Sequence, residues 1–246
     1  MKNRIEQIRR RAAYRLGREP IDVRPLRGIL SISFDDFPKS AWEVAGPLLR
    51  HHEIKATYYV SGGLCGGVNM GKPQFTVKDL QELYEEGHEV GCHTYSHTSV
   101  LKMEKGQLAA EIDRNAQWVA DRLDGHQMTH FAYPYGDISL SAKKYVGTRF
   151  THSRGVRDGI NIEEADRNNL LAIGLESRRL PHYDLESIFQ QTAHHRGWLI
   201  VYGHDIGKNP TPYGCTLRDL ERIIELAREA RLDIVPIGKA LKKLSF

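Results

Sequence analysis

Short apolar runs rich in β-branched residues alternate with amphipathic stretches along most of this chain. Runs typical of buried strands cover residues 29–35, 55–61, 88–93, 129–134, 149–155, 170–176, 198–204 and 233–237. Apolar positions at helical spacing cover residues 40–52, 76–86, 104–123, 140–147, 185–196, 216–231 and 239–244. This alternation predicts an α/β fold in which helices wrap a parallel sheet.

Residues at the ends of the predicted helices support these boundaries. Ser40, Thr76 and Thr216 stand where N-caps are expected, and an acidic residue follows the two threonines three positions later. Gly87 and Gly197 stand where helices should end.

Seven or eight such units in succession favour a closed β/α barrel over an open, doubly wound sheet. The phosphate-binding glycine pattern of doubly wound folds is absent after the first strand, which ends in two acids. The glycine-rich stretch 62–67 follows the second strand and lacks the Lys-Ser/Thr of a phosphate loop. We expect it to be a loop that faces the substrate.

Composition and charge separate an N-terminal arm from the rest. A chain of 246 residues that is 40% hydrophobic can form one large domain, assigned here to residues 25–246. Residues 1–24 hold eight basic and three acidic side chains, a net charge of +5. Because the whole chain carries +4, the remaining residues sum to −1 and are slightly acidic. Apolar residues at near-helical spacing predict a basic helical arm: Ile5, Ile8, Ala12 and Leu16.

The arm has two interpretations, an amphipathic helix that meets an anionic membrane, an acidic glycan or a partner, and a solvated helix that leans on the barrel. It lacks interleaved aromatic residues, so we expect no nucleic-acid binding. No apolar run approaches the roughly 20 residues of a membrane span, and the first residues lack an apolar signal segment. We therefore expect a cytoplasmic protein, with peripheral contact to the inner face of the membrane through the arm.

The three cysteines are odd in number and widely spaced, which predicts reduced thiols, with Cys92 in the core.

Polar residues gather at the carboxyl ends of the predicted strands. Asp35 and Asp36, His93, Tyr135 and His204 follow four different strands, and in a barrel these ends share one face. A carboxylate with two imidazoles suits zinc or a similar ion and leaves a coordination position for water. The second carboxylate is then a candidate base.

The pair His93 and His97 also has plainer explanations. His-x-x-x-His can place two imidazoles on the surface of one helix, and two histidines with one carboxylate also form the site of non-haem iron oxygenases. The acids at the strand end favour the hydrolytic metal site.

Four segments together resemble the polysaccharide deacetylase family, carbohydrate esterase family four. They are Ser33–Pro38, His93–His97, Phe131–Gly136 and Val201–Asp205, in the order of the family's motifs, and the likeness covers residues 28–240. The resemblance implies a distorted β/α barrel with about seven parallel strands. It also implies metal-dependent removal of acetyl groups from N-acetylglucosamine-type glycans. The Phe131–Gly136 segment is most similar to deacetylases of adhesive exopolysaccharides, such as holdfast.

The resemblance also implies roles for individual residues. Asp35 would be the general base and His204 the catalytic acid, while the backbone N–H of Tyr135 would stabilise the oxyanion. The metal ligands would be Asp36, His93 and His97, and the metal Zn²⁺, with Co²⁺ as an alternative.

The sequence departs from the family's pattern in two places. Many members have an arginine that holds the base where Ala132 stands, so we expect Arg154 or Arg157 to replace it. The acid that orients His204 is not evident, and Asp158 and Asp166 are the candidates.

Several aromatic residues are candidates to stack on sugar rings. Tyr133 and Tyr135 flank the turn of the third motif and are the favoured pair; the others are Tyr95, Tyr202, Trp42 and Tyr213.

The sequence therefore predicts a metal-dependent N-deacetylase of a bacterial exopolysaccharide or its precursor. The alternative is a catalytically degenerate barrel that only binds glycan.

Overall fold

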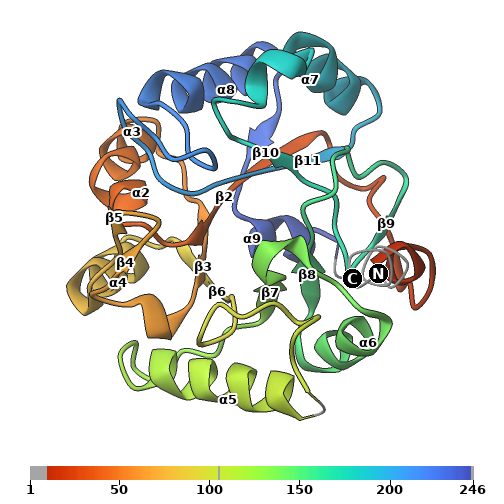
Figure 1. The fold of residues 1–246 in the computed structure, drawn as a ribbon. Coiled ribbons are helices and arrows are strands. Elements are labelled where there is room, and N and C mark those ends of the chain that lie inside the picture. Colours follow the sequence, from red (N-terminus) through yellow and green to blue (C-terminus); the bar gives the residue numbers. More distant parts are fainter. Residues whose placement is uncertain (1–9, 105, 245–246) are drawn as a thin grey trace.

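The molecule is built around one parallel sheet that curls into a barrel (Figure 1). The computed structural model describes residues 10–104 and 106–244. Seven strands follow one another across the sheet in the order β10, β11, β2, β3, β6, β7, β8, and β12 pairs with the start of β2. In chain order they are β2 Ile29–Asp36, β3 Thr57–Val60, β6 Glu89–Cys92, β7 His130–Ala132, β8 His152–Arg154, β10 Ile173–Gly174, β11 Trp198–Gly203 and β12 Asp233–Ile234.

The two edges of this sheet approach each other. An isolated parallel bridge joins Arg154 of β8 to Leu170, shortly before β10 begins. The expected distorted β/α barrel with about seven parallel strands is confirmed.

Helices surround the barrel on the outside (Figure 1). They are α2 Ser40–Glu43, α3 Ala45–His51, α4 Val77–Glu85, α5 Gln107–Ala120, α6 Leu140–Arg149, α7 Leu185–His194 and α8 Leu217–Glu229, with short 3₁₀ turns η1 Gly62–Leu64, η2 Pro134–Gly136 and η3 Leu180–His182. Helix α9 Ile237–Lys242 instead lies in the middle of the ring of strands, where Ile237 and Ala240 pack into the core inside the barrel (Figure 1). The single helix expected over residues 40–52 is divided at Val44.

The predicted helix ends are mostly confirmed. Thr76 and Thr216 form reciprocal capping boxes with the acids three residues later. Ser40 is not an N-cap, because Lys39 occupies that position and the Ser40 hydroxyl accepts the Ile206 N–H instead. The C-cap expected at Gly197 is also wrong: Arg196 takes the left-handed conformation there, with φ +54°.

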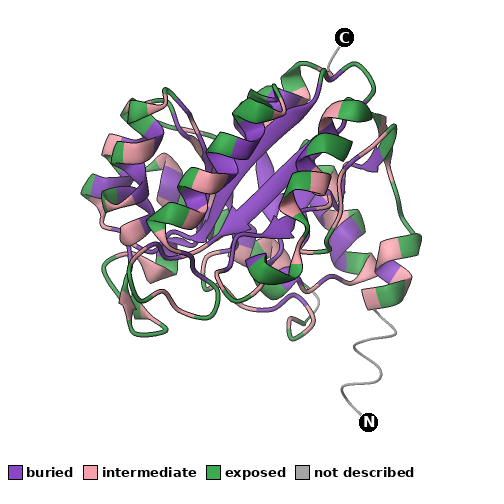
Figure 2. Ribbon diagram, turned by 90° about the horizontal axis from the view of Figure 1, so that it is seen from above, coloured by how far each residue is buried: buried purple, intermediate pink, exposed green. Residues whose placement is uncertain are grey.

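Both faces of the central strands are buried (Figure 2). Along β2, even-numbered residues such as Phe34 join the core beneath the helices, and odd-numbered residues such as Ile29 join a second core inside the barrel. The interior also contains Tyr59 and Tyr202. Because side chains alternate along a strand, Asp35 projects into this interior.

The described part of the N-terminal arm packs on the barrel. Residues 10–15 are helical, and the buried Lys143 ammonium donates to the carbonyls of Ala13 and Leu16. Strand β1 Pro20–Asp22 then pairs with β9 Glu164–Asp166 in antiparallel fashion. The predicted apolar positions Ile5 and Ile8 lie outside the described residues, and the domain boundary at residue 24 stays a prediction. No described helix combines the length and apolar character needed to cross a bilayer.

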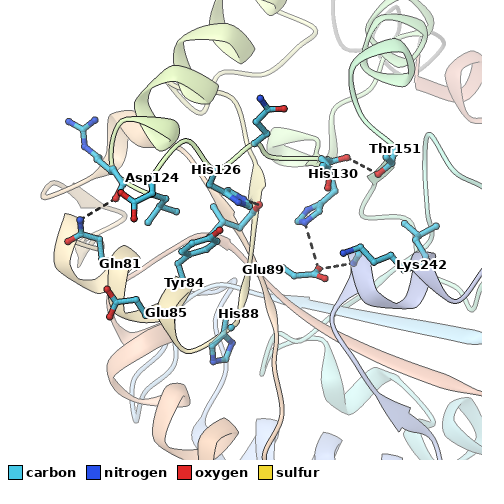
Figure 3. A pocket seen from close by; sticks show the side chains of 18 residues that line it. Gln81, Tyr84, Glu85, His88, Glu89, Asp124, His126, His130, Thr151 and Lys242 are labelled. Atoms are coloured by element: carbon cyan, nitrogen blue, oxygen red, sulfur yellow. Dashed lines mark hydrogen bonds and ion pairs between the residues drawn. The ribbon is translucent and has the colours of Figure 1, made fainter. Parts of the chain in front are cut away.

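A cavity of about 840 Å³ lies where β6 and β7 begin (Figure 3), and none of its lining residues lines the cavity of the predicted site. The Glu89 carboxylate in it accepts hydrogen bonds from the backbone N–H groups of Gly238 and Lys239, and it lies 3.7 Å from Nε2 of His130. These contacts attach α9 to the barrel, which indicates a structural role for Glu89.

Candidate active site

The turn after β2 separates two adjacent carboxylates. Asp36 and Phe37 both have φ of +63°, in the left-handed region that residues other than glycine seldom adopt. Asp35 therefore keeps its strand direction into the barrel, while Asp36 turns toward the end of β6. Such backbone conformations cost on the order of 1–3 kcal/mol each and concentrate at functional sites.

His93 and His97 face Asp36 from the segment that follows β6. Nδ1 of His93 lies 2.8 Å from the Ala132 carbonyl, to which it can only donate. This fixes the tautomer and leaves the Nε2 lone pair directed at Asp36. His97 has φ of +49°, so local backbone geometry turns its ring back toward the same point.

These three side chains fit a divalent metal ion. Oδ1 of Asp36 lies 3.0 Å from Nε2 of His97 and 3.4 Å from Nε2 of His93, and all the ligand atoms lie within 4.8 Å of one another. Oδ1 is buried, and no described residue gives it a hydrogen bond of good geometry. A bound cation would satisfy these converging lone pairs. The searched residues, 10–104 and 106–244, contain no second group of this kind.

The charge of Asp36 agrees with a ligand role. Burial alone raises the pKa of this carboxyl, but His93 and His97, when protonated and acting as charged donors, outweigh burial and hold the pKa well below its usual value. Asp36 is therefore a carboxylate, the form that binds metals.

Asp35 forms a buried ion pair with Arg154, which comes from β8. The Arg154 guanidinium lies between two tyrosine rings, 5.1 Å from the centre of Tyr59 and 4.9 Å from that of Tyr202. Burial raises the pKa of Asp35, but the charge and hydrogen bond of Arg154, together with the charges of His93 and His204, lower it by more, so the net shift is downward. Asp35 is thus held ionised inside the barrel.

This ion pair answers which residue holds Asp35 in place of the arginine that many family members have at the position of Ala132. Arg154 supplies the expected replacement, whereas Arg157 packs over the ring of Tyr14, 5.8 Å from its centre.

His204 follows β11 at the same end of the barrel. Its Nδ1 lies 3.3 Å from the backbone carbonyl of Tyr213. The two acids expected to orient His204 do not contact it, because Asp158 binds Arg179 and Asp166 binds Lys143. A carbonyl therefore takes the place we assigned to a carboxylate.

Tyr135 lies in the turn η2 with φ of +60°, and its ring contacts that of His97 at 4.4 Å between centres. The neighbouring Gly136 is required here, since a Cβ would come within 2.0 Å of Val156. Tyr135 is 63% exposed, as a residue that contacts sugar must be, but Tyr133 is buried and its hydroxyl bonds the Asn168 carbonyl. The expectation that Tyr133 stacks on sugar is wrong.

The other aromatic candidates divide in the same way. Trp42 is buried under the helices, and Tyr202 is nearly buried beside Arg154. Tyr95 packs under Arg114, whose guanidinium lies 3.7 Å from the centre of the ring. Tyr213 is 40% exposed and lines the site, so Tyr213 and Tyr135 are the candidates that keep an exposed ring there.

One cavity of about 410 Å³ brings the predicted residues together, namely Asp35, Asp36, His93, His97, Tyr135 and His204. The roles assigned to these six residues stay predictions. The cavity is also lined by residues that the sequence did not indicate, among them Asn69, Met70, Glu176, Arg178 and Arg179. Glu176 ends the predicted strand 170–176, so the strand-end rule would have found it; Asn69 follows no strand of the barrel and left no such signal.

Comparison with known proteins agrees with this geometry. Residues 23–148 match the family model described as polysaccharide deacetylase. The chain is 29% identical over 122 residues to a chitin deacetylase of Arthroderma benhamiae (48% of this chain, 31% of the relative). It is 28% identical over 120 residues to the peptidoglycan-N-acetylglucosamine deacetylase PgdA of Listeria monocytogenes (48% and 24%). The chain thus spans a third or less of the length of these relatives.

The fold has solved counterparts. The Xyl-CE4 domain of a multidomain xylanase from the hindgut metagenome of Trinervitermes trinervoides superposes with a TM-score of 0.61 at 18% identity, over 88% of this chain and 91% of that domain. At this identity the likeness concerns the fold alone. The match to the family model spans half of the sequence and includes Asp35, Asp36, His93 and His97; this chain belongs to the polysaccharide deacetylase family.

Proposed function

We propose that this protein is a metal-dependent deacetylase that removes acetyl groups from N-acetylglucosamine-type residues of a bacterial exopolysaccharide or its precursor. One observation carries the proposal: Asp36, His93 and His97 converge on one point while Asp35, held ionised by Arg154, lines the same cavity. This arrangement supplies a metal site and a separate base.

Asp36, His93 and His97 would hold the ion, with Zn²⁺ as our choice and Co²⁺ as the alternative. When bound, such an ion lowers the pKa of a coordinated water and polarises the acetyl carbonyl. Three protein ligands are the number found in catalytic zinc sites.

Asp35 would accept the proton of the attacking water. Arg154 keeps this carboxylate charged and engages one of its oxygens, so the other remains for the water. The water oxygen bonds to the acetyl carbon, and the backbone N–H of Tyr135 would donate to the oxyanion that forms.

His204 would complete the reaction by giving a proton to the amide nitrogen as the C–N bond breaks. A donor hydrogen bond from Nδ1 to the Tyr213 carbonyl would leave Nε2 to carry that proton. The products are acetate and a free amine, which balances one water and one amide.

The substrate class is supported by the two relatives, named for chitin and for peptidoglycan N-acetylglucosamine. Tyr135 and Tyr213 offer exposed aromatic faces at the mouth of the cavity, suited to sugar rings. Within that class we propose an exopolysaccharide, because of the form of the Phe131–Gly136 segment.

The test is acetate release from a panel of N-acetylated oligosaccharides after the metal is removed with EDTA and zinc or cobalt is restored. We expect release only with metal, and its loss in Asp35→Asn. Metal-loaded protein that binds the oligomers but releases no acetate would favour the degenerate glycan-binding barrel. Purified protein that holds only iron would favour an oxygenase.

We further propose a cytoplasmic location with membrane contact through the basic arm. Two of the arm's arginines are engaged on the barrel, Arg10 with Asp137 and Arg18 with Glu164, so the contact would depend on other basic residues of the arm, namely those in residues 1–9 together with the exposed Arg11 and Arg15. Sedimentation with anionic vesicles should decrease when residues 1–9 are removed and Arg11 and Arg15 are replaced by glutamine; unchanged sedimentation would refute the membrane contact.

A further inference from the structure

We propose that Asn69, on the hairpin β4–β5, is a positioning residue that aligns the Asp36 carboxylate for metal binding. The inference rests on the proposed function, since it concerns the same metal centre. It adds to that centre a residue from a hairpin that is not part of the barrel sheet.

The two carboxylate oxygens of Asp36 have different partners. Nδ2 of Asn69 donates a hydrogen bond of 3.1 Å to Oδ2, while Oδ1 faces the imidazoles of His93 and His97. Nδ2 is the donor end of the amide, and Oδ2 can only accept.

A carboxylate needs such a partner to keep one orientation. Its terminal torsion is broad, so without a donor on Oδ2 the two oxygens can exchange places or tilt away from the ligand plane. Among the metal ligands, His93 is fixed in this way by the Ala132 carbonyl. Asn69 provides the equivalent restraint for Asp36, and loss of such partners commonly costs 10–100-fold in metal affinity.

The hairpin that carries Asn69 is well defined. β4 Val68–Asn69 pairs with β5 Lys72–Pro73, and the turn residues Met70 and Gly71 both have positive φ, +49° and +74°, as in a type I′ turn. Asn69 precedes the two turn residues that need positive φ, so the turn does not require asparagine at this position.

A second contact anchors the same hairpin on the other side of the site. Nζ of Lys72 donates to the Asn209 carbonyl at 2.7 Å and lies 3.5 Å from Oδ2 of the buried Asp205, the residue after His204. The hairpin is thus held between the segment of the metal ligand and the segment of the proposed acid, which keeps Asn69 in place.

Core packing does not explain Asn69 either. Its neighbours on the hairpin are open to solvent, with Val68 71% and Met70 56% exposed, and Asn69 itself is only partly buried. Among the described residues, the hydrogen bond made by the Asn69 side chain is the one to Asp36.

The test is zinc affinity, measured by competition with a chromogenic chelator, in Asn69→Leu and Asn69→Ala. The matched control is Asn209→Leu, the same change at an exposed asparagine whose backbone carbonyl accepts the Lys72 hydrogen bond. The absorption spectrum of the cobalt-loaded proteins reports the ligand geometry, and thermal unfolding in EDTA checks the fold.

We expect both Asn69 variants to bind zinc about 10–100-fold more weakly and to show an altered cobalt spectrum. Asn209→Leu should stay within about twofold of the parent, the limit we set for no effect. Folded Asn69 variants with unchanged affinity and spectrum would overturn the inference. A parent protein that binds neither ion would instead overturn the proposed function.

Discussion

Arg154 and Asp35 form an ion pair inside the barrel although three strands of the sheet lie between β2, which carries Asp35, and β8, which carries Arg154. Both side chains are almost completely buried, and the curl of the sheet brings them face to face. A buried pair of this kind depends on both partners, since either charge alone is costly in the interior.

We therefore expect Arg154→Met to be severe. Removal of one partner leaves a buried carboxylate uncompensated and should lower the free energy of unfolding by about 3–5 kcal/mol, measured by urea denaturation. The pKa of Asp35 should rise, so the acid limb of the kcat/KM profile should move to higher pH. Arg157→Met is the control, and an unmoved acid limb in Arg154→Met would contradict the role of Arg154.

The two adjacent acids should separate metal binding from chemistry. Asp36→Ala should lose zinc, because Asp36 supplies the convergent carboxylate oxygen. Asp35→Asn should keep zinc but release acetate about 10²–10⁴-fold more slowly, the usual contribution of a general base. Metal analysis and the acetate assay are read on the same samples; loss of zinc from Asp35→Asn would show that our division of roles is wrong.

Gly136→Ala should disrupt the Tyr135 turn. The new methyl group would meet Cγ2 of Val156 at 2.0 Å. The alanine backbone would also have to adopt φ of +63°. Overpacking of this kind costs about 1–3 kcal/mol, and the variant should be less active as well as less stable. The double variant Gly136→Ala/Val156→Ala should regain part of the stability in urea denaturation, and no recovery at all would point to backbone strain alone.

Buried neutral histidines should make the fold sensitive to acid. Burial lowers the pKa of His88 to about 4 and that of His130 to about 3, from 6.5. Because the unfolded chain binds these protons first, stability is full above pH 6.5 and falls as the pH drops toward 4, by up to about 1.4 kcal/mol per pH unit and group.

The measurement is urea unfolding in EDTA at several pH values. In His88→Asn the amide oxygen can still accept the Ala56 N–H that Nδ1 accepts now, so the fold should persist with a shallower slope. An equal slope in parent and variant would show that His88 does not cause the acid sensitivity.

The sequence by itself determined the barrel and the position of the site within it. Strand and helix periods alternate along most of the chain, and the carboxyl ends of parallel strands share one edge. The sequence therefore places Asp35, His93 and His204 at the same end of the barrel, and they line one cavity there.

Only the tertiary structure decided the contacts between segments that no period connects. The closure of the sheet selected Arg154 over Arg157 and buried Tyr133, while a hairpin outside the repeating pattern brought Asn69 to Asp36. A strand pattern fixes which face a side chain points to, but its partner depends on the curvature that brings distant strands and loops together.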